Sequence, residues 1–270
     1  MKKIDITPES ASWGYSGLKV VELDAGGEYR CDTGDDETIV VPLQGAVTVT
    51  ADGETAELAG RANVFAGPTD VAYVPIGAAL LLRSARGGRF ALATARATRR
   101  LPFRHVQLPE VRVELRGAGS CSRQVNNFGT PDVLDADRII ACEVLTPGGN
   151  WSSYPPHKHD EESEHESVLE EIYYFEVAGG GPAYQRVSGT DERPIDILEE
   201  VRTGDVVLIP HGWHGPSMAA PGYDLYYLNV MAGPGERAWL ICDHPEHAWV
   251  RDTWKDQEID SRLPFGGDAR

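Results

Sequence analysis

The chain has 270 residues, of which 41% are hydrophobic, and its formal net charge is −17 at pH 7. This length allows one or two domains with a sizeable core, and the hydrophobic content is ordinary for a globular protein. The strong negative charge argues against nucleic acid and anionic membrane surfaces as partners, because both would repel it.

The N-terminus and the cysteines indicate the expected compartment. No apolar run approaches the roughly 20 residues that a membrane helix needs. The start, MKKIDITPESASWGY, has two lysines without an apolar segment behind them, so no secretory signal is expected. We therefore expect a cytoplasmic protein. In that compartment the cysteines should be free thiols, because none has CxxC spacing: Cys31, Cys121, Cys142 and Cys242.

The first half of the chain predicts an antiparallel all-β unit. Residues 37–50, ETIVVPLQGAVTVT, predict two β-branched strands separated by Pro42 and a turn at Gln44 and Gly45. Short apolar runs broken by Gly, Pro and Asp follow, with turn signals at the roughly 8–12-residue spacing of a β-sandwich or barrel. Residues 98–130 are basic and then rich in Gly and Ser, and we expect them to connect two units.

Strands resume at residue 138 and predict a second all-β unit. Its apolar segments are RIIACEVLTPGG, LEEIYYFEV, AYQRVSG, GDVVLIPHGWHGP and YDLYYLNVMAG. Residues 60–77 and 203–220 both place a glycine before an apolar strand that ends in Pro and Gly, which suggests a tandem duplication.

Histidines in the second unit have the spacing of a metal site. His157 and His159 stand two apart in YPPHKHD, and alternate residues of a strand point to the same face. Glu171 lies at the start of the strand EEIYYFEV, and a Pro–Gly turn in GDVVLIPHGWH precedes His214. Three imidazoles and one carboxylate suit Zn, Mn, Fe, Ni or Co, with positions left for substrate or water.

Two choices stay open at this point. The strand pattern does not decide between Glu170 and Glu171, because both faces of the strand are apolar. The long insert between His159 and this strand is predicted to be a solvated acidic loop. Other histidines of the second unit compete for the ligand roles: His165, His211, His244 and His247.

These motifs resemble those of a known family. The HxH pair, the glutamate and the G-x5-P-x-G-x-H spacing resemble the two cupin motifs, and the layout resembles a bicupin, with two tandem double-stranded β-helix (jelly-roll) barrels. More narrowly, SSYPPHKHD, LEEIYYFEV, GDVVLIPHGWHGP and YDLYYLNVMAGP resemble the 5-deoxy-glucuronate isomerase family of inositol catabolism. That family is similar to the 4-deoxy-uronate ketol-isomerases of pectin breakdown. The resemblance is dense over about residues 120–255.

The resemblance implies one divalent metal per chain and a specific reaction. Its metal ligands fall on His157, His159, Glu171 and His214. The first half offers Cys31 and acids in EYRCDTGDDE where an HxH would stand, so we expect an N-terminal domain (1–115) without metal and a C-terminal metal-binding domain (116–270) with a C-terminal extension. The implied reaction converts 5-deoxy-D-glucuronate to 5-dehydro-2-deoxy-D-gluconate, so an aldehyde at C1 becomes a ketone at C2.

Such an isomerisation moves a proton from C2 to C1 through an enediol, and the substrate carboxylate needs a cation or paired donors. Beside the metal ligand Glu171, the candidates for proton transfer are Lys158, Tyr227, Tyr173 and His211. Those for the carboxylate are Arg123 with Asn126, and Gln185 with Arg186. Gln185 and Arg186 are adjacent on one strand, so only one of them can enter the barrel.

Two other functions remain possible from the sequence: a metal-dependent dioxygenase on the same scaffold, and a metal-free sugar-binding module. The expected partner is a small-molecule deoxy-uronate. The strands EEIYYFEV and YDLYYLNV are apolar on both faces, which suggests packing between two sheets or two subunits. We therefore expect a homodimer or a larger homo-oligomer.

Overall fold

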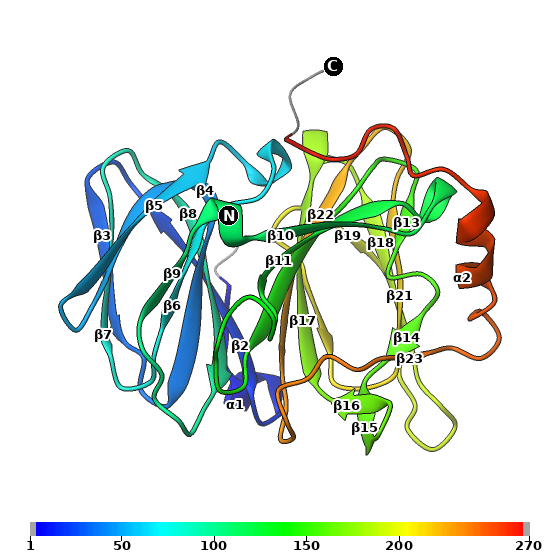
Figure 1. Cartoon of the computed structure of the whole chain (residues 1–270), viewed down its shortest axis with the longest axis horizontal. Coiled ribbons are helices and arrows are strands. Elements are labelled where there is room, and N and C mark those ends of the chain that lie inside the picture. Colours follow the sequence, from blue (N-terminus) through cyan, green and yellow to red (C-terminus); the bar gives the residue numbers. More distant parts are fainter. Residues whose placement is uncertain (1–3, 267–270) are drawn as a thin grey trace. The chain divides into compact units, whose positions relative to one another are not determined.

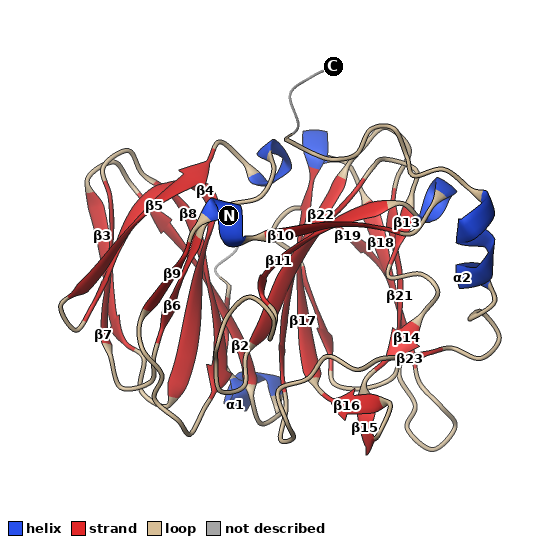
Figure 2. Ribbon diagram, viewed as in Figure 1, coloured by secondary structure: helices blue, strands red, loops and turns tan. Residues whose placement is uncertain are grey.

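The computed structural model describes residues 4–266, and β-strands make up most of it (Figure 2). The helices of this part are short: α1 (Pro8–Ala11), α2 (Val250–Thr253) and the 3-10 helices η1 (Val64–Ala66), η2 (Leu108–Glu110), η3 (Gly119–Cys121), η4 (Ala178–Gly180) and η5 (Trp254–Asp256). None of them has the length and apolar character needed to cross a membrane. The predicted all-β class is confirmed.

The chain divides into two compact units. Unit 1 comprises Met1–Arg112, Asn127–Cys142 and Val230–Arg237. Unit 2 comprises Val113–Asn126, Glu143–Asn229 and Ala238–Arg270. The strands of each unit curl into antiparallel sheets (Figure 1), as expected for two tandem jelly-roll barrels.

A nine-stranded sheet built from residues 5–106 lies in unit 1. Along its main path the order is β1-β2-β8-β4-β6-β9, with β5 on β4 and β7 joining β4 to β3. The strands are β1 (Asp5–Ile6), β2 (Ser16–Leu23), β3 (Gly27–Asp32), β4 (Asp36–Ala51), β5 (Glu54–Arg61), β6 (Val71–Val74), β7 (Ala79–Ser84), β8 (Gly88–Arg96) and β9 (Arg104–Val106). Alternate apolar residues of these strands form its core, including Val40, Val49, Leu82, Phe90 and Leu92.

Strand β4 differs from the prediction. The expected turn at Gln44 and Gly45 is wrong, because Asp36–Ala51 is one continuous strand of 16 residues. Its register shifts between Pro42 and Gln44 against β8, and again beyond Gly45 against β5. A proline without an N–H and a glycine at φ +87° fit β-bulges as well as they fit a turn. The bulges let a single strand pair with β8 in its first half and with β5 and β7 in its second.

A buried carboxylate organises one end of unit 1. Glu37 in β4 is fully buried and accepts hydrogen bonds from the backbone N–H groups of Asp137 (2.9 Å), Arg138 (2.6 Å) and Ile139 (2.7 Å). The Tyr73 hydroxyl donates a fourth, at 2.7 Å. Glu37 therefore satisfies three consecutive backbone donors that have no strand partner of their own.

Asp137 makes a second polar connection in unit 1. Its carboxylate accepts hydrogen bonds from the backbone N–H of Thr98 (2.7 Å) and from the Arg99 side chain (2.6 Å). Burial alone would raise the pKa of Asp137, but the Arg99 guanidinium and the two backbone amides hold it at about 2. A lowered pKa stabilises the fold above the unfolded-state value, near 4, and this stabilisation is lost as the pH falls toward 2.

We therefore expect Asp137→Asn to lower the free energy of unfolding at pH 6 by about 1–2 kcal/mol. The difference from the wild type should shrink as the pH falls from about 4 to about 2, because the wild-type carboxylate is then protonated as well. Urea unfolding of both proteins across this range measures the effect. A difference that stays constant with pH would contradict the assignment.

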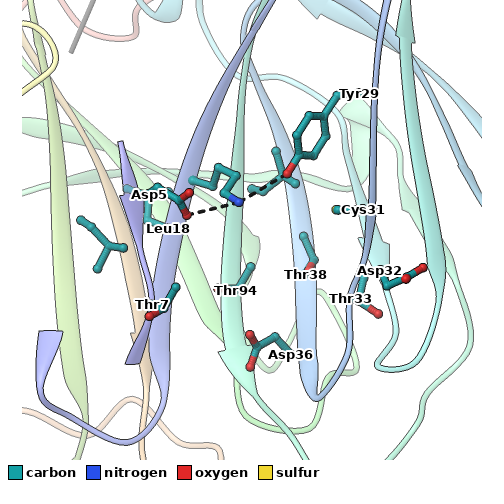
Figure 3. A pocket seen from close by; sticks show the side chains of 13 residues that line it. Asp5, Thr7, Leu18, Tyr29, Cys31, Asp32, Thr33, Asp36, Thr38 and Thr94 are labelled. Carbon is teal, nitrogen blue, oxygen red and sulfur yellow. Dashed lines mark hydrogen bonds and ion pairs between the residues drawn. The ribbon is translucent and has the colours of Figure 1, made fainter. Parts of the chain in front are cut away.

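Unit 1 also contains a polar cavity of about 130 Å³ (Figure 3). Lys19 projects into it, 3.2 Å from the Asp5 carboxylate and 3.4 Å from the Tyr29 hydroxyl. Cys31 and Asp36, from the segment EYRCDTGDDE, line the same cavity. Burial raises the pKa of the Cys31 thiol, which favours the protonated form over the thiolate that binds metals.

Two six-stranded sheets and a hairpin follow along the chain. The first sheet has the order β10-β11-β12-β22-β17-β20, and the second β19-β18-β21-β14-β23, with β13 on β21. The strands are β10 (Arg112–Arg116), β11 (Arg123–Gly129), β12 (Ile140–Thr146), β13 (Trp151–Ser152), β14 (His157–Lys158), β15 (Asp160–Ser163), β16 (Glu166–Val168), β17 (Glu170–Val177), β18 (Ala183–Ser188), β19 (Asp196–Val201), β20 (Val206–Ile209), β21 (Trp213–Ala219), β22 (Leu225–Ala232) and β23 (Cys242–Asp243).

Strands β17 and β22 are apolar on both faces, as the sequence indicated. Seven of the eight residues of β17 and all of β22 are buried within a single chain. This burial accounts for the double-sided apolar pattern without a second subunit. The expected homo-oligomer therefore stays a prediction, which light scattering can test.

A C-terminal segment containing α2 and η5 runs along unit 2, drawn in orange to red in Figure 1. The carbonyl of Glu258 accepts from the N–H of Gly119 (2.8 Å), and the N–H of Asp260 donates to the Ser122 hydroxyl (3.0 Å). These bonds attach the segment to the chain just before β11, and its helix α2 follows directly after the edge strand β23.

Candidate metal centre

Three histidines come together in unit 2. His157 in β14 is the direct cross-strand partner of His214 in β21, and His159 follows two residues after His157. The ring centroids of His214 lie 4.3 Å from those of His157 and 4.6 Å from those of His159. One nitrogen of each ring lies within 4.8 Å of the others, and all three residues are buried. The spacing in the sequence and the strand pairing thus place these rings around one point.

A carboxylate completes the cluster. Glu171 in β17 is 1% exposed, and one of its oxygens lies 3.1 Å from Nε2 of His159 and 3.0 Å from Nε2 of His214. Its other oxygen accepts a hydrogen bond from the Asn229 amide of β22. Glu170, on the opposite face, is partly exposed. The geometry therefore distinguishes the two adjacent glutamates where the sequence pattern could not.

Backbone carbonyls fix the orientation of two of the rings. Nδ1 of His159 lies 3.1 Å from the carbonyl oxygen of Leu169, and Nδ1 of His214 lies 3.1 Å from that of Gly212. A carbonyl only accepts, so each Nδ1 carries a proton, and the Nε2 of each ring is left to face Glu171. Nε2 of His214 is buried and makes no hydrogen bond within residues 4–266. A metal ion between these two Nε2 atoms and the carboxylate would give all three a partner.

The pKa shifts reflect the close contact between the rings and the carboxylate. Burial would lower the pKa of His159, but its contact with Glu171 raises it. Burial, followed by the two neighbouring imidazoles, lowers the pKa of His157 well below its usual value. Burial would raise the pKa of Glu171, but His214 and His159 hold it far below its usual value. Neutral imidazole and ionised carboxylate are the forms that bind metals. The residues present therefore fit a divalent ion that accepts nitrogen and oxygen ligands.

Lys158 does not join this cluster, because its amine is surrounded by three carboxylates. Its Nζ lies 2.9 Å from Asp160, 2.8 Å from Glu166 and 3.2 Å from Glu161. Burial would lower the pKa of Lys158, but the bonds to Glu166 and Asp160 raise it, so the amine stays protonated. The predicted acidic loop is the hairpin β15–β16. Its acids Glu161, Glu162 and Glu164 are exposed, as predicted, whereas the side chains of Asp160 and Glu166 are largely buried because they pair with Lys158.

The hydroxyls of two tyrosines and one serine lie close together near the histidines. The rings of Tyr173 and Tyr227 are stacked at 4.8 Å, and both hydroxyls meet the Ser153 hydroxyl, at 3.0 and 3.2 Å. The Tyr173 ring lies 6.1 Å from that of His214. Burial raises the pKa of both tyrosines, so both hydroxyls keep their protons at neutral pH. His211, the other candidate, has a buried Nε2 without a hydrogen bond among the described residues.

Most of the candidates for carboxylate binding are occupied by other contacts. The Asn126 amide donates to Glu143 at 2.7 Å. Gln185 is buried and donates to the carbonyl of Arg186 at 2.9 Å. Arg186 itself turns to the other face of β18 and pairs with Asp196 of β19. Contacts within the protein are sufficient to explain why these three polar side chains stand where they do.

Arg123 is different, because it is a buried cation without an anion. It is 5% exposed, and its guanidinium donates only to the backbone carbonyls of Cys121 (3.0 Å) and Tyr154 (3.5 Å). Within residues 4–266 no carboxylate lies at ion-pair distance from it. Burial lowers the pKa of Arg123 to about 10. A buried charge of this kind is stabilised by a bound anion.

Two contributors to the centre were not identified from the sequence. Asn229 holds Glu171 in place, and Ser153 joins the two tyrosine hydroxyls. A signal for Asn229 does exist, because it follows Tyr227 by two residues on β22 and so shares its face. Ser153 lies in an irregular stretch before β14, where strand alternation gives no information.

Comparison with known proteins is consistent with this geometry. The model of the KduI/IolB family matches residues 2–250. A protein named 5-deoxy-glucuronate isomerase from Geobacillus kaustophilus is 42% identical over 254 residues, covering 93% of this chain and 91% of the relative. One of the same name from Lacticaseibacillus casei is 39% identical, covering 92% of each.

Solved structures give the same result for the fold. An IolB-like protein from Salmonella typhimurium LT2 superposes with a TM-score of 0.86 at 34% identity, over 91% of this chain and 94% of that one. Bacillus subtilis oxalate decarboxylase superposes with a TM-score of 0.63 at 12% identity, over 88% of this chain and 74% of that one. The second likeness concerns the fold alone and agrees with the predicted bicupin architecture.

Proposed function

This chain belongs to the KduI/IolB family, and we infer that it is a 5-deoxy-glucuronate isomerase. It is an aldose–ketose isomerase that converts 5-deoxy-D-glucuronate to 5-dehydro-2-deoxy-D-gluconate. The relatives that carry this name match nearly the whole chain at about 40% identity. The observation that carries the chemistry is the buried cluster of three imidazoles, two of which face the Glu171 carboxylate through Nε2.

We propose that His157, His159, Glu171 and His214 hold one divalent metal ion: Zn, Mn, Fe, Ni or Co. When bound, such an ion would polarise the substrate carbonyl and stabilise negative charge on the sugar oxygens. The carbonyl-fixed tautomers of His159 and His214 and the orphaned Nε2 of His214 support this ligand set. Asn229 would keep the Glu171 carboxylate in its ligating orientation.

The tyrosine pair supplies a second element of the proposed mechanism. Isomerisation places a developing negative charge on O1 and O2 of the substrate in turn, and a nearby hydroxyl can donate a hydrogen bond to it. Tyr227 is the proposed catalytic donor, linked through Ser153 to Tyr173 beside His214. Because Lys158 is held protonated by carboxylates, the proposal gives it no part in removing the C2 proton.

Metal analysis and an anaerobic assay test the proposal together. We expect about one equivalent of metal per chain, and isomerisation of 5-deoxy-D-glucuronate without oxygen. A chelator should abolish the activity, and the native metal should restore it. Turnover that consumes oxygen and stops in anaerobic buffer would favour the dioxygenase. A metal-free protein that binds the sugar without turnover would favour the binding module.

A further inference from the structure

A cavity lined by two arginines lies in unit 2, outside the proposed ligand set. It measures about 340 Å³ and is lined by Arg116, Trp239, Ile241, Asp243 and Arg251, and we refer to it as the arginine cavity. Asp243 of β23 is the cross-strand partner of His157 of β14. Opposing residues of antiparallel strands have Cα atoms about 5 Å apart. The cavity therefore borders the strand that carries the first histidine.

Positive charge is concentrated around this cavity. Arg251 pairs with Asp243 through two bonds, one of 2.7 Å, while Arg123 has no carboxylate partner among the described residues. Arg251 and Arg123 both approach the ring of Trp254, at 5.2 and 5.3 Å from its centroid. Arg116, which pairs with Glu114 at 2.9 Å, adds a third guanidinium. In the ion pairs within residues 4–266, these guanidiniums meet the carboxylates of Asp243 and Glu114, in a chain whose net charge is −17.

The arginines lie close to one another and to the strand of the first histidine. Arg251 is bonded to Asp243, which stands directly opposite His157. After burial, the charges of Arg116 and Arg251 contribute to the lowered pKa of Arg123. Through Asp243 and the shared Trp254 ring, Arg251 therefore connects the histidine strand with the unpaired guanidinium.

Trp239 adds an unused donor. Its Nε1 is buried and makes no hydrogen bond within the described part of the chain. The Arg116 guanidinium lies 5.6 Å from the centroid of the same ring. A cavity that combines guanidiniums with a free indole N–H offers donors in excess and is suited to an anion with several oxygens.

We propose that the arginine cavity is the subsite for the carboxylate of the substrate, with Arg251 and Arg116 as binding residues and Arg123 as a buried charge that reinforces them. This proposal rests on the proposed function, because a uronate carries its carboxylate at the opposite end of the chain from its aldehyde. Because Asp243 of the cavity stands directly opposite His157, the proposal places the two ends of the substrate on neighbouring strands. The arginines would then bind the carboxylate end of the substrate, and its aldehyde end would lie at the histidines.

Calorimetric binding of two probes tests the subsite without relying on activity. The probes are D-glucuronate and D-glucose, which differ in a carboxylate, titrated into the purified full-length protein. We expect the wild type to bind D-glucuronate more tightly than D-glucose, and Arg251→Gln or Arg116→Gln to weaken D-glucuronate binding at least about tenfold. The control Arg202→Gln removes an exposed arginine that pairs with Glu200, and it should bind as the wild type does.

A double variant separates substrate binding from simple neutralisation of Asp243. If Arg251 only balances that acid, Arg251→Gln combined with Asp243→Asn should recover wild-type binding, and the proposal fails. If Arg251 holds the carboxylate, binding stays weak, and the KM for 5-deoxy-D-glucuronate rises more than kcat falls. Equal wild-type affinities for the two probes would also overturn the proposal. Tight D-glucuronate binding without isomerisation would instead overturn the proposed function alone.

Discussion

His214→Ala will lose isomerase activity and most of its metal, while its β-sheet structure persists. Removing this imidazole opens one position of the proposed ligand set and leaves Glu171 without one of its two ring partners. Loss of a direct ligand should weaken metal binding by more than the roughly 10–100-fold typical of residues that only support ligands. Metal content, the isomerase assay and circular dichroism measure the three quantities on one sample.

His165→Ala is the matched control for this experiment. His165 is exposed and lies in the turn of the β15–β16 hairpin, only a few residues from the cluster in sequence. We expect its metal content and activity to equal those of the wild type. Full activity in the His214 variant, or loss of metal in the His165 variant, would show that the ligands are assigned wrongly.

The second large effect concerns stability. Glu37→Ala removes the acceptor for three backbone N–H groups and the Tyr73 hydroxyl. Each buried donor left without a partner costs roughly 1–3 kcal/mol, so the variant should lose more than about 3 kcal/mol of unfolding free energy. Urea unfolding followed by circular dichroism measures this loss.

Glu57→Ala in β5 serves as its control. Glu57 is an exposed glutamate of the same unit that accepts a single hydrogen bond from Thr48 (2.8 Å). Its removal should change the unfolding free energy by no more than about 0.5 kcal/mol. Equal stabilities of the two variants would mean that water or backbone adjustment satisfies the N–H groups of residues 137–139 once Glu37 is removed.

The histidine cluster could be predicted from the sequence because its signal is local. His157 and His159 share a face through strand alternation, and the Pro–Gly turn before His214 marks the start of the partner strand. The choice of Glu171 was beyond this reasoning, because alternation identifies a face only when the two faces differ. Strand β17 is buried on both faces, so its pattern contained no such difference.

The remaining errors and omissions have identifiable physical causes. Pro42 and Gly45 suit a turn and a bulge equally, and the choice depends on neighbours that the local sequence does not show. The acids of the insert were predicted to be solvated, because their pairing with Lys158 depends on how the hairpin folds back. Arg116 and Arg251 come together only in the tertiary structure.

The attachment of the C-terminal segment has a consequence for how this enzyme can diverge. The proposed metal ligands belong to the barrel strands and the residues that lead into them, whereas Arg251 and Trp254 belong to a segment that follows the last strand. In the proposed subsite, Arg251 can therefore vary independently of the metal ligands, whereas Arg116 lies in β10, ahead of them. Changes after β23 would then alter recognition of the carboxylate while the proposed ligand set passes unchanged from one lineage to the next.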